Sequence, residues 1–211
     1  MNRAISLVLV SIVATLIWVC SLFSPPAFAE AESPNLAVEE AARLLDEAVS
    51  GRRDELAQDK EALYAVIDEI LLPRFDRRYA AQLVLARHWR TASDEQRNQF
   101  IVAFYNNMMR LYAEAILDFN LGRMEILPFR GDATKKRTTV RTIMRLDDGT
   151  KVPVNYGMVS RESIWKMFDV TIEGISYIRN FKAELNAEIQ VEGLDGVISR
   201  LQAKTKGSAA E

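Results

Sequence analysis

The sequence predicts an α+β domain, in which helices pack on a four-stranded, mainly antiparallel, twisted sheet and enclose an apolar cavity. Between residues 36 and 119 the apolar positions recur at helical spacing, whereas between residues 124 and 172 they alternate along the chain. Helical segments followed by a run of strands are typical of α+β domains. The chain of 211 residues is long enough for one such domain, which we expect to span residues 30–202.

A secretory signal peptide is expected at residues 1–29. Arg3 precedes an almost wholly apolar run from Ala4 to Phe23, and the tripeptide AFA that ends at Ala29 has the small-x-small pattern of a cleavage site. We therefore expect export across the inner membrane and cleavage after Ala29. Two alternatives remain: the apolar run approaches the about 20 residues that a membrane anchor needs, and Cys20 is a candidate acylation site of a lipoprotein.

The composition argues against nucleic-acid binding, metal binding and thiol chemistry. With 27 basic and 29 acidic residues the formal net charge is −2, so the chain lacks the positive charge that nucleic acid attracts. His88 is the only histidine, and the only cysteine, Cys20, lies in the expected signal peptide, which leaves no site of several His or Cys ligands. The glycine patterns of nucleotide sites and the G-x-S-x-G motif of hydrolases are missing from the sequence. We therefore expect no cofactor and no metal.

Three helices are predicted at the start of the mature chain. The first has its apolar stripe between Leu36 and Val49 and ends at Gly51. The second runs from Lys60 to Leu72, because Pro73 lacks an amide hydrogen and clashes with the preceding turn. The third is predicted from Asp76 to Trp89.

A longer fourth helix is expected to begin at Ser93 and to reach about Phe119. The Ser93 hydroxyl can accept a hydrogen bond from the amide of Gln96, whose side chain reaches back to the Ser93 amide, in a reciprocal capping box. The apolar stripe of this helix is wider than one contact surface requires. We therefore expect the helix to touch more than one neighbour.

Four strands are predicted after this helix, at residues 124–127, 137–146, 151–159 and 163–172. Asp148 and Gly149 form a strong tight-turn signal, so the second and third strands should pair as an antiparallel hairpin.

The last predicted strand has apolar residues at both alternating positions. Trp165 and Met167 belong to one set, and Phe168, Val170 and Ile172 belong to the other. A strand with one solvent-exposed face would be polar at every second position. We therefore expect this strand to be covered on both sides, by other protein or by a ligand.

The C-terminal segment is predicted to be helical and then disordered. Gly174 punctuates the last strand, and helical spacing resumes at Ile175. A short final helix is expected over Leu194–Leu201, followed by a disordered tail at residues 203–211.

The inward faces of the sheet and of the long helix are the candidate ligand-binding surface. Such stripes are usually solid core, which remains an alternative, but flexible methionines favour an adaptable pocket. Alternation also leaves open which face of the sheet points inward. The candidate residues are Phe104, Met108, Leu111, Tyr112, Val140, Met144, Val154, Tyr156, Met158, Trp165 and Met167.

Several segments, in their order along the chain, resemble the MlaC-type family of periplasmic lipid carriers, also called the toluene-tolerance auxiliary family. These segments are LLPRFD with its downstream HW, RTASDEQRNQFIVAFYNNMMRLY, the hairpin strands, WKMFDVTIEGIS and GLDGVISRL. Trp165, Asp169 and Gly174 match the tryptophan, aspartate and glycine of the family's strand pattern.

The resemblance implies a periplasmic protein that holds a phospholipid by its acyl chains. Such a protein shuttles lipid between an inner-membrane ABC transporter complex and an outer-membrane lipoprotein complex, in a system associated with outer-membrane lipid asymmetry and toluene tolerance. The resemblance brings no catalytic residues, and it makes the candidate cavity residues lipid-binding candidates. A related branch is associated with hopanoids, so a hopanoid is the alternative ligand. We expect a monomer.

Two other functions remain open from the residues alone. A small enzyme would place an acid such as Asp169 in the cavity as a base, although a strand-end aspartate more often caps or pairs structurally. An interaction protein would have a solid core and no ligand. A cluster of Arg74, Arg77 and Arg78 after Pro73 could approach a phosphate or an acidic partner, or could be a solvated face.

Overall fold

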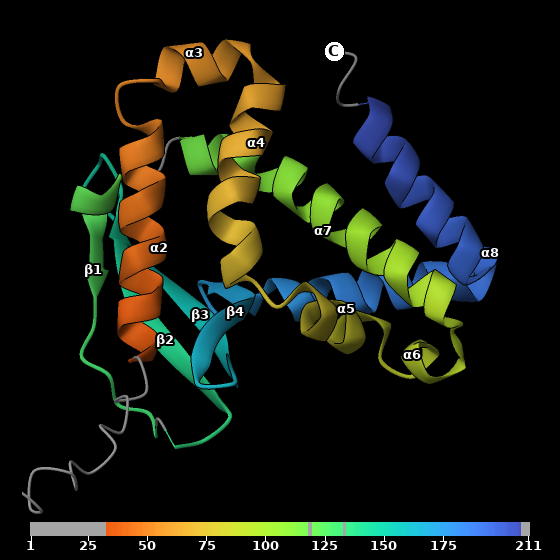
Figure 1. The fold of residues 1–211 in the computed structure, drawn as a ribbon. Coiled ribbons are helices and arrows are strands. Elements are labelled where there is room, and N and C mark those ends of the chain that lie inside the picture. Colours follow the sequence, from red (N-terminus) through yellow and green to blue (C-terminus); the bar gives the residue numbers. More distant parts are fainter. Residues whose placement is uncertain (1–32, 118–119, 133, 208–211) are drawn as a thin grey trace, which may run out of the picture. The chain divides into compact units, whose positions relative to one another are not determined.

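The computed structural model describes residues 33–117, 120–132 and 134–207, and the predicted signal peptide lies outside them (Figure 1). None of the described helices is both long and apolar enough to cross a membrane. The helices are α2 (Pro34–Val49), α3 (Arg53–Gln58), α4 (Lys60–Leu71), α5 (Arg77–Leu85), α6 (His88–Thr91), α7 (Asp94–Leu117) and α8 (Tyr177–Gly207), with 3-10 turns η2 (Leu72–Arg74) and η3 (Leu121–Arg123).

Five antiparallel strands form one sheet in the order β1-β2-β3-β4-β5. They are β1 (Met124–Ile126), β2 (Arg137–Arg145), β3 (Lys151–Arg161), β4 (Ile164–Ile172) and β5 (Ile175–Ser176). The predicted hairpin turns at Gly149, whose φ of +84° suits a glycine. The α+β class is therefore confirmed, with one short edge strand more than predicted.

A β-bulge in β4 reverses the alternation of its side chains. Met158 of β3 lies opposite Met167, and Tyr156 lies opposite Val170, so β4 uses one residue more than β3 over this stretch. Residues opposite one another share a face of the sheet, which puts Met167 and Val170 on the same side. The prediction that these apolar residues lie on two opposite faces is wrong for this reason. The bulge, at Phe168, brings both sets to one face.

The side chain of Phe168 is held by two neighbours. Its ring meets the ring of Tyr79 on α5 edge-on, with 5.0 Å between centroids. A Cβ atom at Gly157 would lie 3.0 Å from the Phe168 ring, so the glycine on β3 leaves room for the bulged residue. The bulge is thus matched by a glycine on the neighbouring strand.

The helices cover the sheet in two groups. Helix α2 lies against β2 and β4, and α4 packs between α2 and α7 (Figure 1). Helices α5, α7 and α8 pack on one another, and α8 and α5 also contact β4. The capping box at the start of α7 is confirmed: the Gln96 amide donates to Ser93 Oγ (3.1 Å), and the Ser93 amide donates to Gln96 Oε1 (3.0 Å).

Three local assignments differ from the predictions. The helix predicted over Asp76–Trp89 is divided into α5 and α6 at Ala86, whose φ of 49° is incompatible with a continuing helix. Helix α3 carried no prediction, because only one of its six side chains is buried and no apolar stripe marks it. Ile175 and Ser176 pair with β4 as β5 instead of beginning the last helix.

The last helix joins two predicted helices. Gly193, with φ 75° and ψ 171°, interrupts the helical geometry just before the predicted final helix at Leu194. The helix continues to Gly207, so the prediction of a disordered tail is wrong for residues 203–207. The rest of the predicted tail lies outside the described residues.

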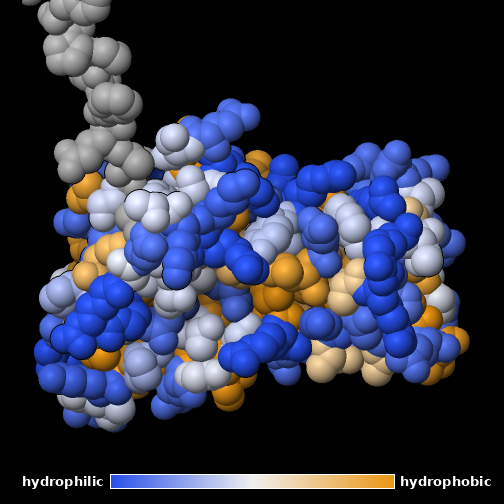
Figure 2. Space-filling model, turned by 90° about the horizontal axis from the view of Figure 1, so that it is seen from below, coloured by the Kyte–Doolittle hydropathy of each residue, from blue (hydrophilic) through white to orange (hydrophobic). Residues whose placement is uncertain are grey.

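The packed core lies where α5, α7 and α8 meet the sheet. Phe104 is 1% exposed; its ring stacks on Phe100 at 5.6 Å and meets Phe181 edge-on at 5.3 Å. The same cluster of buried residues includes Val140 and Met158 of the sheet. On the face shown in Figure 2, hydrophobic residues reach the surface in patches between hydrophilic ones.

Candidate functional site: an apolar cavity

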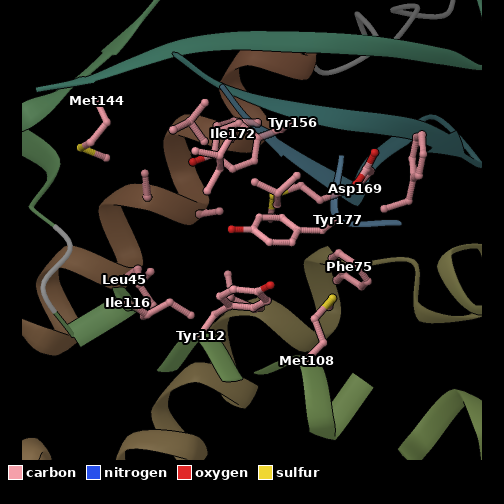
Figure 3. Close-up of a pocket in the computed structure, with 18 of the residues that line it drawn as sticks. Leu45, Phe75, Met108, Tyr112, Ile116, Met144, Tyr156, Asp169, Ile172 and Tyr177 are labelled. Carbon is pink, nitrogen blue, oxygen red and sulfur yellow. The ribbon is translucent and has the colours of Figure 1, made fainter. Parts of the chain in front are cut away.

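An apolar cavity of about 440 Å³ lies between the sheet and the helices (Figure 3). This volume is within the range of about 300–1,000 Å³ that is typical of small-molecule sites. The lining residues are Val38, Ala41, Ala42, Leu45, Leu71, Phe75, Met108, Met109, Tyr112, Ile116, Met144, Leu146, Val152, Val154, Tyr156, Met167, Phe168, Asp169, Val170, Ile172, Tyr177 and Ile178.

Helix α2 forms one wall of the cavity. Its lining residues run from Val38 to Leu45 at spacings of i, i+3, i+4 and i+7, which place them on one helix face. Ala41 and Ala42, in the middle of this face, carry single methyl groups. Protein interiors are otherwise close-packed, so these short side chains leave part of the space that forms the cavity.

The cavity is open to solvent near the β2–β3 hairpin. Leu146, which lines this end, is 46% exposed. Phe75 and Met108 line the other end and are buried; Figure 3 shows them on the opposite side of the cavity from Met144 and Ile116. The exposed end of the cavity therefore lies beside the hairpin, and its buried end lies at Phe75 and Met108.

Six of the eleven residues predicted from alternation and helical spacing line the cavity. On β2 and β3 the face that carries the candidate residues borders the cavity, whereas on β4 residues of both predicted sets do. These six residues are Met108, Tyr112, Met144, Val154, Tyr156 and Met167.

The other five predicted residues do not line the cavity. Phe104, Val140, Met158 and Trp165 are buried in the packed core, where large side chains fill the space between the sheet and α7. Leu111 is 61% exposed, because it precedes Tyr112 by one position and so lies on a different face of α7.

Several lining residues carried no prediction of a ligand contact. Those on α2 belong to the apolar stripe that predicts the helix. The adjacent alanines Ala41 and Ala42 could have indicated a cavity, because their short side chains leave space beside the helix. Tyr177 and Ile178 begin α8, whose start cannot be separated from the end of the sheet by spacing alone. Phe75 reaches the cavity because its backbone pairs with that of Met167 in an isolated parallel bridge.

Three tyrosines from different elements line the cavity: Tyr112 of α7, Tyr156 of β3 and Tyr177 of α8 (Figure 3). The rings of Tyr112 and Tyr177 lie 4.6 Å apart. Burial raises the pKa of Tyr156 to about 12. Burial, and then the neighbouring Tyr177, raises the pKa of Tyr112. Tyr112 and Tyr156 therefore stay uncharged at neutral pH.

Asp169 is the one charged residue among those that line the cavity, and its carboxylate is already hydrogen-bonded. Oδ2 accepts from Ser176 Oγ at 2.6 Å, and Oδ1 accepts from the amide of Ile178 at 3.0 Å. Ser176 Oγ in turn accepts from the amide of Arg179 at 3.1 Å. The pair caps the first turn of α8, as side-chain oxygens do at helix N-termini. Asp169 thus has the structural role of a cap.

The walls of the cavity are suited to burying the apolar surface of a ligand. In the part of the chain that the structure describes, no group of three His, Cys, Asp or Glu residues could hold a metal ion. The walls offer aliphatic, methionine and aromatic surface with neutral hydroxyls. Methionines adapt to ligands of variable shape because their side chains are flexible.

An α+β fold whose sheet and helices enclose an almost uncharged, apolar cavity defines a protein of the hydrophobic-ligand-binding class. Residues 39–203 match the MlaC protein family. The chain therefore belongs to this family, and the resemblance seen in the sequence is confirmed.

Relatives of known name include two proteins of similar sequence. The intermembrane phospholipid transport system binding protein MlaC of Haemophilus influenzae is 23% identical over 195 residues, which are 90% of each chain. The toluene tolerance protein ttg2D of Pseudomonas putida is 24% identical over 148 residues, which are 70% of this chain and 68% of that protein.

A solved structure has the same fold. The phospholipid-binding protein of Ralstonia solanacearum, determined in complex with a phospholipid, superposes with a TM-score of 0.75 at 22% identity. The match covers 84% of this chain and 99% of that one. The likeness supports the arrangement of helices and strands described above.

Proposed function

We propose that this protein is a periplasmic carrier that holds the acyl chains of a phospholipid in the apolar cavity. The observation that carries the proposal is the cavity of about 440 Å³, whose one charged lining residue is already engaged in capping α8. The names of the relatives support phospholipid as the ligand class. The export signal predicted from the sequence, with cleavage expected after Ala29, fits the proposed compartment.

The energetics of acyl chains explain why a carrier is needed. Two chains of about 16 carbons contain about 30 methylenes, and at about 0.8 kcal/mol each their exposure to water costs on the order of 20 kcal/mol or more. Such a lipid does not cross an aqueous compartment freely at a useful rate. A dry cavity removes the penalty, because a protein interior and a membrane are similarly apolar.

The direction of lipid transport would be set by the partners of the carrier. If the cavity and the membrane are similarly apolar, transfer between them is nearly balanced, so the carrier cannot drive transport by itself. We propose that it exchanges lipid with an inner-membrane ABC transporter complex and with an outer-membrane lipoprotein complex. The sequence has no Walker nucleotide motif, so ATP hydrolysis would belong to the transporter.

A carrier rather than an enzyme is supported by the contacts of Asp169. A general base must reach the proton that it abstracts, whereas both oxygens of this carboxylate accept hydrogen bonds from the start of α8. We propose that the protein leaves its ligand chemically unchanged.

Native mass spectrometry of protein purified without detergent tests the proposal. We expect an added mass that corresponds to one phospholipid, and lipid extraction should return the same molecule intact. A folded protein that purifies empty and takes up no phospholipid from vesicles would contradict the proposed function. A ligand released in altered form would instead support an enzyme.

A further inference from the structure

A second pocket, of about 490 Å³, lies next to the apolar cavity and has the opposite character. We call it the basic pocket: its charged lining residues are Asp76, Arg77, Arg78, Arg161 and Lys166. Phe75 lines both pockets. The two therefore adjoin at this residue.

The single carboxylate of the basic pocket is already neutralised. Asp76 Oδ2 accepts from Arg161 Nε at 2.6 Å, and Asp76 Oδ1 accepts from the amide of Tyr79 at 2.9 Å, which caps α5. The Asp76 side chain is only 12% exposed, so this pair is largely removed from solvent. One acid thus compensates one arginine and leaves three cations.

Two of these three cations lie over aromatic rings. The guanidinium of Arg77 lies 5.3 Å from the ring centre of Tyr105, and that of Arg78 lies 5.3 Å from the ring centre of Trp89. Among the described residues, no ion pair engages Arg77, Arg78 or Lys166. Stacking orients a guanidinium without using its N–H donors. The donors stay available to a ligand.

Three uncompensated cations around a concavity select an anion. Arginine presents forked donors that match the oxygens of a phosphate, and lysine adds a point charge. A concave wall of low dielectric also strengthens the field that these charges produce. A phosphate group has the charge and the several acceptor oxygens that this arrangement can satisfy.

We propose that the basic pocket binds a phosphate group, and that this phosphate belongs to the headgroup of the phospholipid carried by the protein. The second part rests on the proposed function. A phospholipid combines acyl chains with a phosphate in one molecule, as the two pockets combine an apolar cavity with a basic one across Phe75. A lipid that occupies both pockets would pass Phe75, the residue that they share.

Calorimetric titration with three probes tests the proposal. The probes are dihexanoyl phosphatidylglycerol, dihexanoylglycerol, which lacks the phosphate, and inorganic phosphate. We expect the unsubstituted protein to bind the phosphatidylglycerol about tenfold more tightly than the glyceride, as charge-assisted contacts to phosphate predict. Raising the salt concentration should reduce this difference, because the pocket faces solvent.

Charge variants identify the site. The triple variant R77Q/R78Q/K166Q should lose the preference for the phosphatidylglycerol and keep its affinity for the glyceride. The control R90Q/K135Q/K182Q removes the same charge from exposed residues outside both pockets and should keep the preference. If the triple variant does not fold, the single variant K166Q decides, because among the described residues no hydrogen bond or ion pair involves that side chain; it should reduce the preference about threefold.

The outcomes separate the two parts of the proposal. An about tenfold preference that stays undiminished in the folded triple variant, or in K166Q, overturns the basic pocket as the site. Binding of inorganic phosphate without any preference between the two lipids overturns the headgroup as the source of the phosphate. If neither lipid binds but inorganic phosphate does, the proposed function fails and the pocket is a site for a free anion.

Discussion

The two ends of the sheet differ: one is packed solid and the other is hollow. Strand β3 passes through both, since Met158 is 1% exposed in the core whereas Tyr156 and Val154 line the cavity. Helix α7 does the same, with Phe104 in the core and Met108 at the cavity. One strand and one helix therefore serve both as core and as wall.

The difference comes from the side chains that oppose the sheet. At the packed end the rings of Phe104 and Phe181 meet at 5.3 Å, in the same cluster as the fully buried Ala80 and Ala81 of α5. At the hollow end α2 presents Ala41 and Ala42. Short side chains thus occur at both ends, and the packed end is filled because aromatic rings occupy the space beside them, which fits the dense packing of protein interiors.

The largest effect is expected at the packed end. Phe104→Ala should lower the free energy of unfolding by about 3–5 kcal/mol, because the removed ring leaves a void in a filled core. Tyr112→Ala should cost clearly less, since its ring already borders empty space. Urea denaturation measures both, and equal losses would remove the distinction between the two ends.

A charge at the hollow end should abolish ligand retention. Met144→Arg and Val154→Arg put a cation on the cavity wall, and we expect at least about tenfold less bound phospholipid in a folded protein, since a charge is costly in an apolar site. Ile143→Arg is the matched control, because the neighbouring residue points to the other face of β2. Lipid extraction and quantification provide the measurement. Normal lipid content in the folded Met144 variant would argue against the cavity as the site.

Larger side chains should change the free energy of unfolding by a smaller amount, and the sign of the change should differ between the hollow end and the packed end. Ala42→Leu should reduce bound lipid a few-fold and raise the free energy of unfolding by about 0.5–2 kcal/mol, as cavity-filling substitutions do. Ala80→Leu, at a fully buried core position, should lower it by about 1–3 kcal/mol through overpacking. Two changes of the same sign would show that the ends are packed alike.

The smallest effect concerns Tyr156 at alkaline pH. Its pKa is raised to about 12, above the value of about 10 in an unfolded chain, so its contribution to stability is complete below pH 10 and is lost as the pH rises through about 12. Absorbance titration at 295 nm should show one fewer late-ionising tyrosine in Tyr156→Phe than in the unsubstituted protein. Identical titration curves for the two proteins would contradict the buried position of this hydroxyl.

Periodicity alone could predict most of the fold, because the features concerned are local. The capping box at Ser93 and the turn at Gly149 depend on neighbouring residues, and both form as expected. The break at Ala86 and the pairing of Ile175 with β4 depend on contacts that are distant in sequence, so spacing could not predict them.

The candidate site was predictable only in part for a related reason. Alternation correctly groups Met144 with Val154 and Tyr156, because successive side chains of a strand point to opposite faces of the sheet. It cannot tell that Met158 meets large opposing side chains whereas Val154 meets open space, because that depends on α2 and α8. The boundary between core and cavity is a tertiary property.

The bulge at Phe168 has a consequence for how this chain tolerates change. Deleting Phe168 would leave Met167 opposite Met158 and Asp169 opposite Gly157, so the residues that follow would keep their partners on β3. Val170 and Ile172 would therefore stay on the ligand side of the sheet. The loss would be the contact between the rings of Phe168 and Tyr79, so the strand can lose one residue at this point without turning the cavity wall around.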